Sequence, residues 1–104
     1  MSVLCEFSMF PIGKGESVST YVAPIVALVR QSGLPYRLTA MGTVFESEAL
    51  ADALGLVHQA YELLDQAGCN RVYATVKLDI RKGKAERLSG KVDSVTSRMG
   101  DIAT

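Results

Sequence analysis

Two periods of hydrophobic residues predict the order of strands and helices along the chain. Apolar residues alternate with others from Val3 to Phe10, which is the period of a strand, and Pro11 and Gly13 then end it. The Ser17–Thr20 cluster supplies hydroxyl groups that can cap a helix, and apolar residues follow it at helical spacing until Gly33. The first third of the chain therefore predicts a strand followed by a helix.

A hairpin, a second helix, a long strand and a third helix are predicted for the rest of the chain. Tyr36–Ala40 and Thr43–Glu46 are short β-prone segments joined by a tight turn. Ser47–Ala67 repeats apolar residues in steps of three and four, and Arg71–Ile80 alternates cleanly. A polar C-terminal helix carries a narrow apolar stripe suited to docking, formed by Leu88, Val92, Val95 and Met99.

The succession β-α-β-β-α-β with a tail helix is the split β-α-β, ferredoxin-like arrangement of the α+β class. It predicts a single domain over residues 1–104, with an antiparallel four-stranded sheet, two helices on one face and the other face open. The first and last strands are neighbours in this topology, so they share the open face. The side chains expected there include Glu6, Ser8, Tyr73, Thr75, Lys77 and Asp79.

The charges and the apolar runs exclude some classes of partner. The chain has 104 residues with 11 basic and 11 acidic side chains, interleaved, so it lacks the broad positive field on which binding to DNA, RNA or anionic membranes depends. The longest apolar run, from Val22 to Val29, is far shorter than the ~18–20 residues that span a bilayer. Without a signal-peptide pattern at the start, we expect a cytoplasmic protein. The modest core of so small a domain favours self-association.

Cysteine, histidine and paired charges do not indicate catalysis or a metal site. Cys5 and Cys69 are far apart in the sequence, and two buried thiols are favoured over a disulfide. His58 lies in a helical segment, where it is expected to be packed or partly exposed. Asp79 and Arg81 end the last strand, as in a solvated turn or a salt bridge between subunits. Since no nucleophile, base and orienting acid can be aligned, no enzymatic activity is expected.

The open sheet face is the first candidate site. With Leu4 and Phe10 beside Glu6, Ser8 and Lys77, it is too apolar to face water and too polar to be a plain core, so we expect it to pack against another subunit. Polar groups enclosed there need partners, either each other or a ligand. The alternative is that a pair between Glu6 and Lys77 only fixes the register of the interface.

Two glycine-containing segments are further candidates. Gly13–Ser17 precedes a helix and is similar to a phosphate loop, but the P-loop spacing is absent and Glu16 would repel a phosphate, so a flexible connection is favoured. Gly42 would let a ligand approach the backbone, while Thr43 and Glu46 offer a hydroxyl and a carboxylate. Alternatively, Glu46 caps the helix that follows it.

Six motifs follow one another along nearly the whole chain. They lie in Glu6–Pro11, Gly15–Ala23, Ser32–Tyr36, Met41–Glu46, Arg71–Arg81 and Lys91–Val95. The set resembles the small thiamine-binding protein family. The resemblance implies a ferredoxin-like fold, homodimers that pair into homotetramers through the open sheet face, and no enzymatic activity or cofactor. It also implies binding of thiamine or its hydroxymethylpyrimidine moiety near subunit interfaces.

The same resemblance implies a set of ligand-binding candidates. A carboxylate would accept from the pyrimidine amino group, hydroxyl or backbone groups would meet the ring nitrogens, and Met or aromatic side chains would stack on the ring. Glu46 and Glu6 both remain candidates for the carboxylate. Ile80 departs from the family pattern of a second acidic residue, so no role that needs two adjacent carboxylates is expected. The whole set is Glu6, Ser8, Ser19, Tyr21, Met41, Gly42, Thr43, Glu46, Lys77 and Asp79.

Three functions are compatible with these observations. The first is a non-enzymatic carrier, store or sensor of thiamine or its pyrimidine moiety. The second is a structural or regulatory homo-oligomeric module that binds another small metabolite, or an anion at the Gly13–Ser17 loop. The third is an enzyme that acts on a thiamine precursor.

Overall fold

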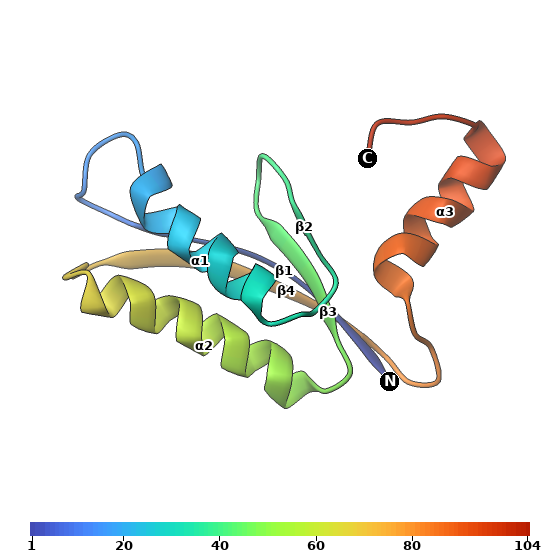
Figure 1. Ribbon diagram of the computed structural model, residues 1–104, viewed down its shortest axis with the longest axis horizontal. Helices are drawn as coiled ribbons and strands as arrows, with labels where there is room; N and C mark the ends of the chain where they lie inside the picture. The colour runs from blue at the N-terminus through green and yellow to red at the C-terminus, as the bar shows by residue number, and fades with distance from the viewer.

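The order of the elements is the one that the sequence predicts. In the computed structural model, which describes residues 1–104, the strands are β1 (Ser2–Pro11), β2 (Tyr36–Leu38), β3 (Thr43–Ser47) and β4 (Val72–Arg81). The helices are α1 (Ser19–Gln31), α2 (Leu50–Gln66) and α3 (Arg87–Met99). All strand pairs are antiparallel and the sheet order is β2-β3-β1-β4. The fold is therefore ferredoxin-like, as predicted (Figure 1).

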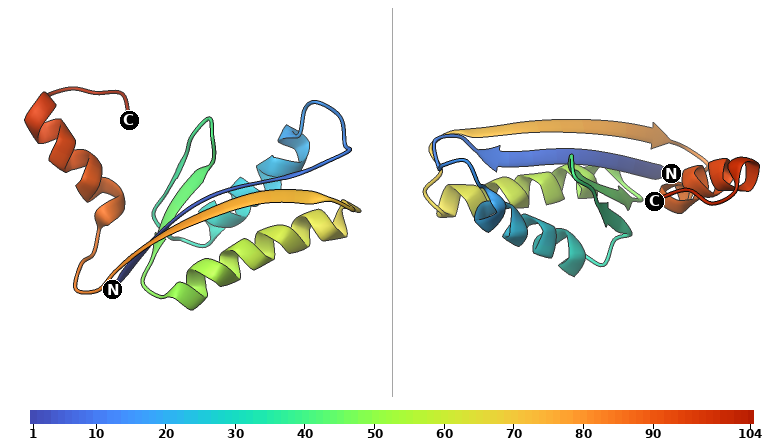
Figure 2. Two further views of the ribbon diagram at one scale, coloured as in Figure 1. Left: turned by 180° about the vertical axis from the view of Figure 1, so that it is seen from behind. Right: turned by 90° about the horizontal axis from the view of Figure 1, so that it is seen from above.

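Helices α1 and α2 cover one face of the sheet and enclose the core (Figure 2). Every second residue of β1 is buried against them, because side chains of a strand alternate between its two faces. The rings of Phe7 and Phe45 meet edge to face at 5.9 Å in the centre of this layer. The other buried apolar residues are Val3, Cys5, Met9, Ile25, Val29, Ala53, Leu56, Ala60, Leu64 and Cys69.

Several element boundaries differ from those predicted. The hydroxyls of Ser17–Thr20 do not cap α1, whose N-cap residue is Val18 and which has no side-chain cap. Strand β2 ends at Leu38, because the Thr39 hydroxyl accepts from the backbone N–H groups of the next turn. Helix α2 begins at Leu50 rather than Ser47, since Ser47 is still part of β3 and lies opposite β1.

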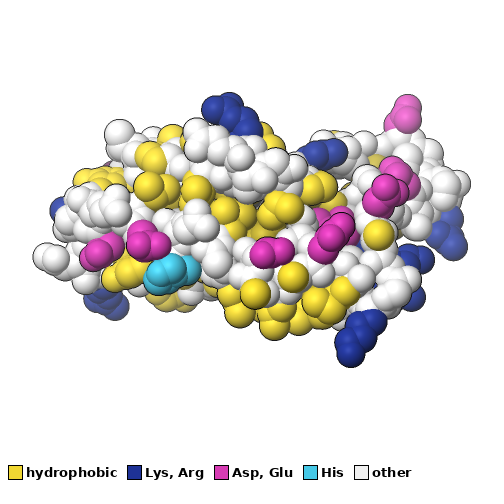
Figure 3. All heavy atoms as spheres, turned by 60° about the horizontal axis from the view of Figure 1, so that its bottom comes forward, with side chains coloured by type: hydrophobic (Ala, Val, Ile, Leu, Met, Phe, Trp, Pro, Cys, Tyr) yellow, Lys and Arg dark blue, Asp and Glu magenta, His cyan; other side chains and the backbone are white.

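The apolar residues that β4 presents to the helical side are only partly covered. Val76, Leu78 and Ile80 are 40%, 39% and 46% exposed. Strand β4 is one of the two edge strands, and α2 leaves these side chains uncovered. Figure 3 shows hydrophobic side chains gathered along the lower border of the molecule, to the right of the histidine. Leu54 and Tyr61 of α2 are also exposed.

Helix α3 stands away from the rest of the chain. It lies beyond the end of the sheet rather than on either face (Figure 2). The radius of gyration is 14.9 Å, above the about 13 Å of a compact chain of 100 residues. Arg87 is the only buried residue of α3, and the predicted stripe exposes Val92, Val95 and Met99. No helix in the chain combines the length and apolarity required to cross a lipid bilayer.

Candidate functional site

The open sheet face brings together the polar residues that the topology predicts to meet there. Glu6 lies opposite Lys77 in the β1–β4 ladder, and Ser8 lies opposite Thr75. The Lys77 Nζ is 3.1 Å from the Glu6 Oε1, so the two side chains form an ion pair. The pair is solvent-accessible, with 42% of the Glu6 side chain exposed, and both groups remain accessible to a ligand or a second subunit.

An aromatic pair adjoins these polar groups on the same face. Phe10 and Tyr73 lie opposite each other, with ring centroids 5.7 Å apart and the planes tilted by 39°. Tyr73 is 54% exposed. The face therefore offers a carboxylate, an ammonium group, hydroxyls and an exposed aromatic ring within five successive pairs of the ladder.

Thr43 and Glu46 point to opposite faces of the sheet, so they do not form one site. Thr43 is buried opposite Phe7 on the core side of β3. Glu46 lies opposite Leu4 on the open side and is only 7% exposed. The two positions are three apart in sequence, and an odd difference along a strand places side chains on different faces.

The carboxylate of Glu46 holds the start of α3. Its Oε2 accepts from the Ser2 hydroxyl and from the backbone N–H of Arg87 at 3.0 Å, and its Oε1 accepts from the N–H of Leu88 at 2.9 Å. Burial alone would raise the pKa of Glu46, but these hydrogen bonds and the Arg87 charge outweigh it and hold the pKa below its usual range. Glu46 does cap a helix, but the helix is α3 rather than the one that follows it in sequence.

Arg87 is a key residue of this cluster that the sequence analysis missed. It is 3% exposed, and its guanidinium donates to the Ser2 hydroxyl and carbonyl and forms an ion pair with Asp79 at 2.9 Å. Lys91 donates to the other Asp79 oxygen at 2.6 Å. Hydrogen bonds from Lys91 and Arg87 lower the pKa of Asp79 to about 2. Asp79 is thus paired within the chain, with Arg87 and Lys91 of α3, rather than with a second subunit.

The remaining predicted residues are spread over other parts of the molecule. Ser19 and Tyr21 lie in the first turn of α1, and Met41 is exposed at the β2–β3 turn. Gly42 has a structural reason to be glycine, because a Cβ there would be 2.9 Å from the Phe7 carbonyl oxygen. The single chain brings Glu6, Ser8 and Lys77 together on the open face, with Gly42 close to Ser8. It joins Glu46 to Asp79 through Arg87, whereas Ser19, Tyr21 and Met41 belong to neither group.

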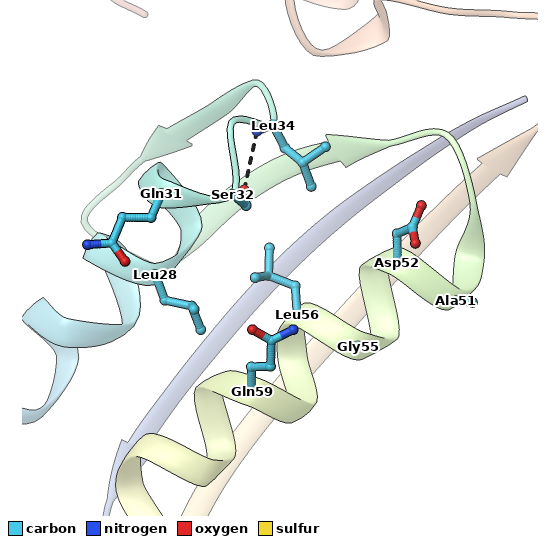
Figure 4. A pocket seen from close by; sticks show the side chains of 9 residues that line it. All are labelled: Leu28, Gln31, Ser32, Leu34, Ala51, Asp52, Gly55, Leu56 and Gln59. Carbon is cyan, nitrogen blue, oxygen red and sulfur yellow. Dashed lines mark hydrogen bonds between the residues drawn. The ribbon is translucent and has the colours of Figure 1, made fainter.

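A hollow lies between α1 and α2, away from every predicted residue. It measures about 480 Å³ and is open to solvent. Leu28 and Leu56 point toward each other across it, with Leu34 above them and Gln31 and Gln59 at its sides (Figure 4). The absence of a side chain at Gly55 leaves this part of α2 open.

Groups that could perform acid–base, nucleophilic or metal chemistry are dispersed. No group of three or more His, Cys, Asp or Glu residues is placed to hold a metal ion. Cys5 and Cys69 are free and buried, and burial together with the nearby Glu6 charge raises the pKa of Cys5 to about 11. His58 is an exposed helix residue whose Nε2 is 3.4 Å from the Glu62 carboxylate. Nothing in this arrangement points to catalysis.

Comparison with known proteins agrees with the fold and with the sequence motifs. The family model described as thiamine-binding protein matches residues 5–96. The chain belongs to the thiamine-binding protein family. A UPF0045 protein of Mycobacterium bovis is 40% identical over 95 residues, which is 91% of this chain and 92% of that one. Another, from Methanothermobacter thermautotrophicus, is 35% identical over 98 residues, or 93% and 99% of the two chains.

Solved structures of similar proteins have the same family fold. A crystal structure of a hypothetical protein from Methanocaldococcus jannaschii has a TM-score of 0.78 at 33% identity, covering 90% of this chain and 95% of that one. A Thermotoga maritima protein, whose name assigns it provisionally to thiamine biosynthesis or salvage, also has a TM-score of 0.78. It covers 91% and 99% of the chains, but at 16% identity it supports the fold alone.

Proposed function

We propose that this protein binds thiamine or its hydroxymethylpyrimidine moiety without transforming it, in a pocket that forms where two open sheet faces meet. The observation that carries the proposal is the row of Glu6, Lys77, Ser8 and Tyr73 on an accessible sheet face. Membership of the thiamine-binding protein family supports it. A carrier, store or sensor of this kind would act in the cytoplasm.

The chemistry of the open face suits a polar heterocycle. A carboxylate accepts hydrogen bonds from an amino group, and a Ser hydroxyl both donates and accepts, which matches the edge of an aminopyrimidine. The exposed Tyr73 ring gives a flat surface on which the heterocycle can stack. Glu6 is the better placed carboxylate, because both oxygens of Glu46 already accept from Ser2 and from the start of α3.

A second copy would supply the enclosure that the flat face lacks. The free edge of β4 and its exposed Val76, Leu78 and Ile80 would pair with the same strand of a second copy, which makes a homodimer. Two dimers would then pack open face against open face. A homotetramer of this kind uses two different surfaces, the β4 edge and the open sheet face. The ligand would lie between two open faces.

Titration calorimetry with thiamine, thiamine phosphate and hydroxymethylpyrimidine tests the proposal. Glu6→Gln is expected to weaken binding ten- to a hundredfold, the range for a lost hydrogen bond to a charged group. Glu16→Gln, at an exposed loop position, is the matched control and should bind normally. No binding of any of the three compounds by the folded wild-type protein would overturn the proposal. It would leave the alternative that the Glu6–Lys77 pair serves assembly alone.

A further inference from the structure

Basic residues are concentrated at the connection between β4 and α3. The chain has a formal net charge of zero, yet five of its 11 Lys and Arg residues lie in the 11 positions from 81 to 91. They are Arg81, Lys82, Lys84, Arg87 and Lys91, and Glu86 is the only acidic residue among them. The balanced composition therefore conceals a local excess of positive charge, so the charges of this segment are not interleaved as expected.

Four of these basic residues line a hollow of about 290 Å³. Arg81 comes from the end of β4, Lys84 from the turn, and Arg87 and Lys91 from the first turns of α3. Gly90 also lines the hollow, and a Cβ built there would meet nothing within 4 Å. Glu86 is the one acidic residue of the lining and only one lining residue is hydrophobic, so the hollow is polar with an excess of positive charge.

The charges around the hollow are only partly neutralised by the protein. Asp79 pairs with Arg87 and Lys91, whose combined effect lowers its pKa to about 2. Arg81 and Lys84 have no acidic partner within 4 Å. The first N–H groups of α3 are occupied by Glu46, so the side chains rather than the helix terminus would bind an anion.

We infer that this hollow binds a phosphate or diphosphate group. It follows that the protein binds thiamine diphosphate more tightly than thiamine. An Arg guanidinium matches phosphate oxygens with paired donors, and a Lys ammonium adds a point charge. The ester part of the inference rests on the proposed function. Arg81 lies four residues after Lys77 on the same face of β4, about 13 Å along the strand. A two-ring ester with its ring at Glu6 can extend its diphosphate arm toward Arg81.

Titration calorimetry with inorganic pyrophosphate, thiamine and thiamine diphosphate at low salt separates the parts of this inference. The variant carries Arg81→Ala and Lys84→Ala, both at exposed positions. The matched control removes the same charge through Lys14→Ala and Arg30→Ala, also exposed and distant from the hollow. Lys14 lies in the glycine-containing loop that was the other candidate for an anion.

The wild-type protein is expected to bind pyrophosphate, with an affinity that falls as salt is added. The Arg81/Lys84 variant should bind pyrophosphate and thiamine diphosphate at least about tenfold more weakly, while its affinity for thiamine is unchanged. The control should resemble the wild type. Absence of pyrophosphate binding, or an equal loss in the control, would overturn the anion site. If thiamine diphosphate binds no more tightly than thiamine, the inferred preference for the diphosphate ester is wrong. If thiamine does not bind, the result counts against the proposed function alone.

Discussion

Glu46 shows how a single carboxylate can organise parts of the chain that are distant in sequence. Its two oxygens accept from the hydroxyl of Ser2 and from the backbone of Arg87 and Leu88, so they join the starts of β1 and α3. A buried carboxylate is stable only when its acceptor positions are filled. The residue is therefore a structural connection, whatever it also does for a ligand.

Glu46→Gln tests this structural role. The substitution removes the charge and replaces one acceptor oxygen by a donor that faces other donors, so the free energy of unfolding should fall by about 1.5–3 kcal/mol. Urea unfolding followed by circular dichroism measures the change. Glu48→Gln, two residues away at an exposed position, is the control and should leave stability within about 0.5 kcal/mol. Equal stability of the two variants would contradict the role.

Two glycines make a matched pair with opposite expected effects. Gly42→Ala would bring a Cβ to 2.9 Å from the Phe7 carbonyl oxygen, so it should destabilise the fold by about 1–3 kcal/mol as the hairpin moves away from β1. Gly55 lies inside α2 with free space around it, and Gly55→Ala should stabilise by about 0.5–1 kcal/mol. Thermal unfolding of both variants measures the sign directly. A stabilising Gly42→Ala would show that the turn moves without cost.

The cysteines should react only when the protein unfolds. Cys5 is fully buried and its pKa is raised to about 11, so very little thiolate exists at pH 8, and Cys69 is also buried. A colorimetric thiol reagent should detect almost no reactive thiol in the native protein and two per chain in urea. Two thiols released only after reduction would show a disulfide instead.

At the scale of elements, the spacing of apolar residues along the chain was sufficient to predict every helix and strand and their order. It also predicted which residues of β1 and β4 share the open face, because the register of neighbouring strands follows from alternation. The boundaries of α1 and α2 were less accurate, since Ser hydroxyls near a helix start did not cap it and β3 continued through Ser47.

The anchoring of α3 could not be predicted from the sequence for a physical reason. Glu46 and Arg87 are 41 positions apart, and neither belongs to a periodic pattern that would bring them together. The segment from Met41 to Glu46 suggested one site, but the alternation of β3 divides Thr43 and Glu46 between the two faces. Residue types gave the chemistry of the candidates, and only the fold decided which of them meet.

The attachment of α3 should weaken in acid. The pKa values of Glu46 and Asp79 both lie below their usual 4.5 and 3.8 in the folded chain, so their ionised forms stabilise it. That contribution is present above about pH 4.5 and is lost as the pH falls through the folded values, to about 2 for Asp79. Urea unfolding between pH 2 and 6 should show stability falling with acid, with a shallower slope in the Glu46→Gln, Asp79→Asn double variant. Identical slopes would contradict this account.

At the scale of the whole molecule, the proposed homotetramer uses two uncovered surfaces, the β4 edge and the open sheet face, and each can be blocked separately. Leu78→Asp places a charge among the exposed apolar residues Val76, Leu78 and Ile80 beside the free edge of β4. Tyr73→Asp places a charge on the open sheet face, and both positions are exposed in the single chain. In a tetramer with two kinds of interface, each variant should give dimers and the combination should give monomers. Size-exclusion chromatography with light scattering measures the mass.

Ala23→Asp, exposed on α1, is the control and should remain tetrameric. A single variant that is already monomeric would show that the two surfaces are not independent. Tetramers in both single variants would show that neither surface carries the assembly.

The contact of Ser2 and Glu46 with Arg87 also has a consequence for the newly made chain. The ribosome releases β1 and β3 long before β4 and α3, although β1 lies between β3 and β4 in the finished sheet. Until the last third of the chain emerges, one edge of β1 stays unpaired and the carboxylate of Glu46 stays in water. Unpaired strand edges are sites of aggregation. A chain whose translation stops before β4 therefore keeps an unpaired edge of β1 and is expected to aggregate, because only β4 can pair with that edge.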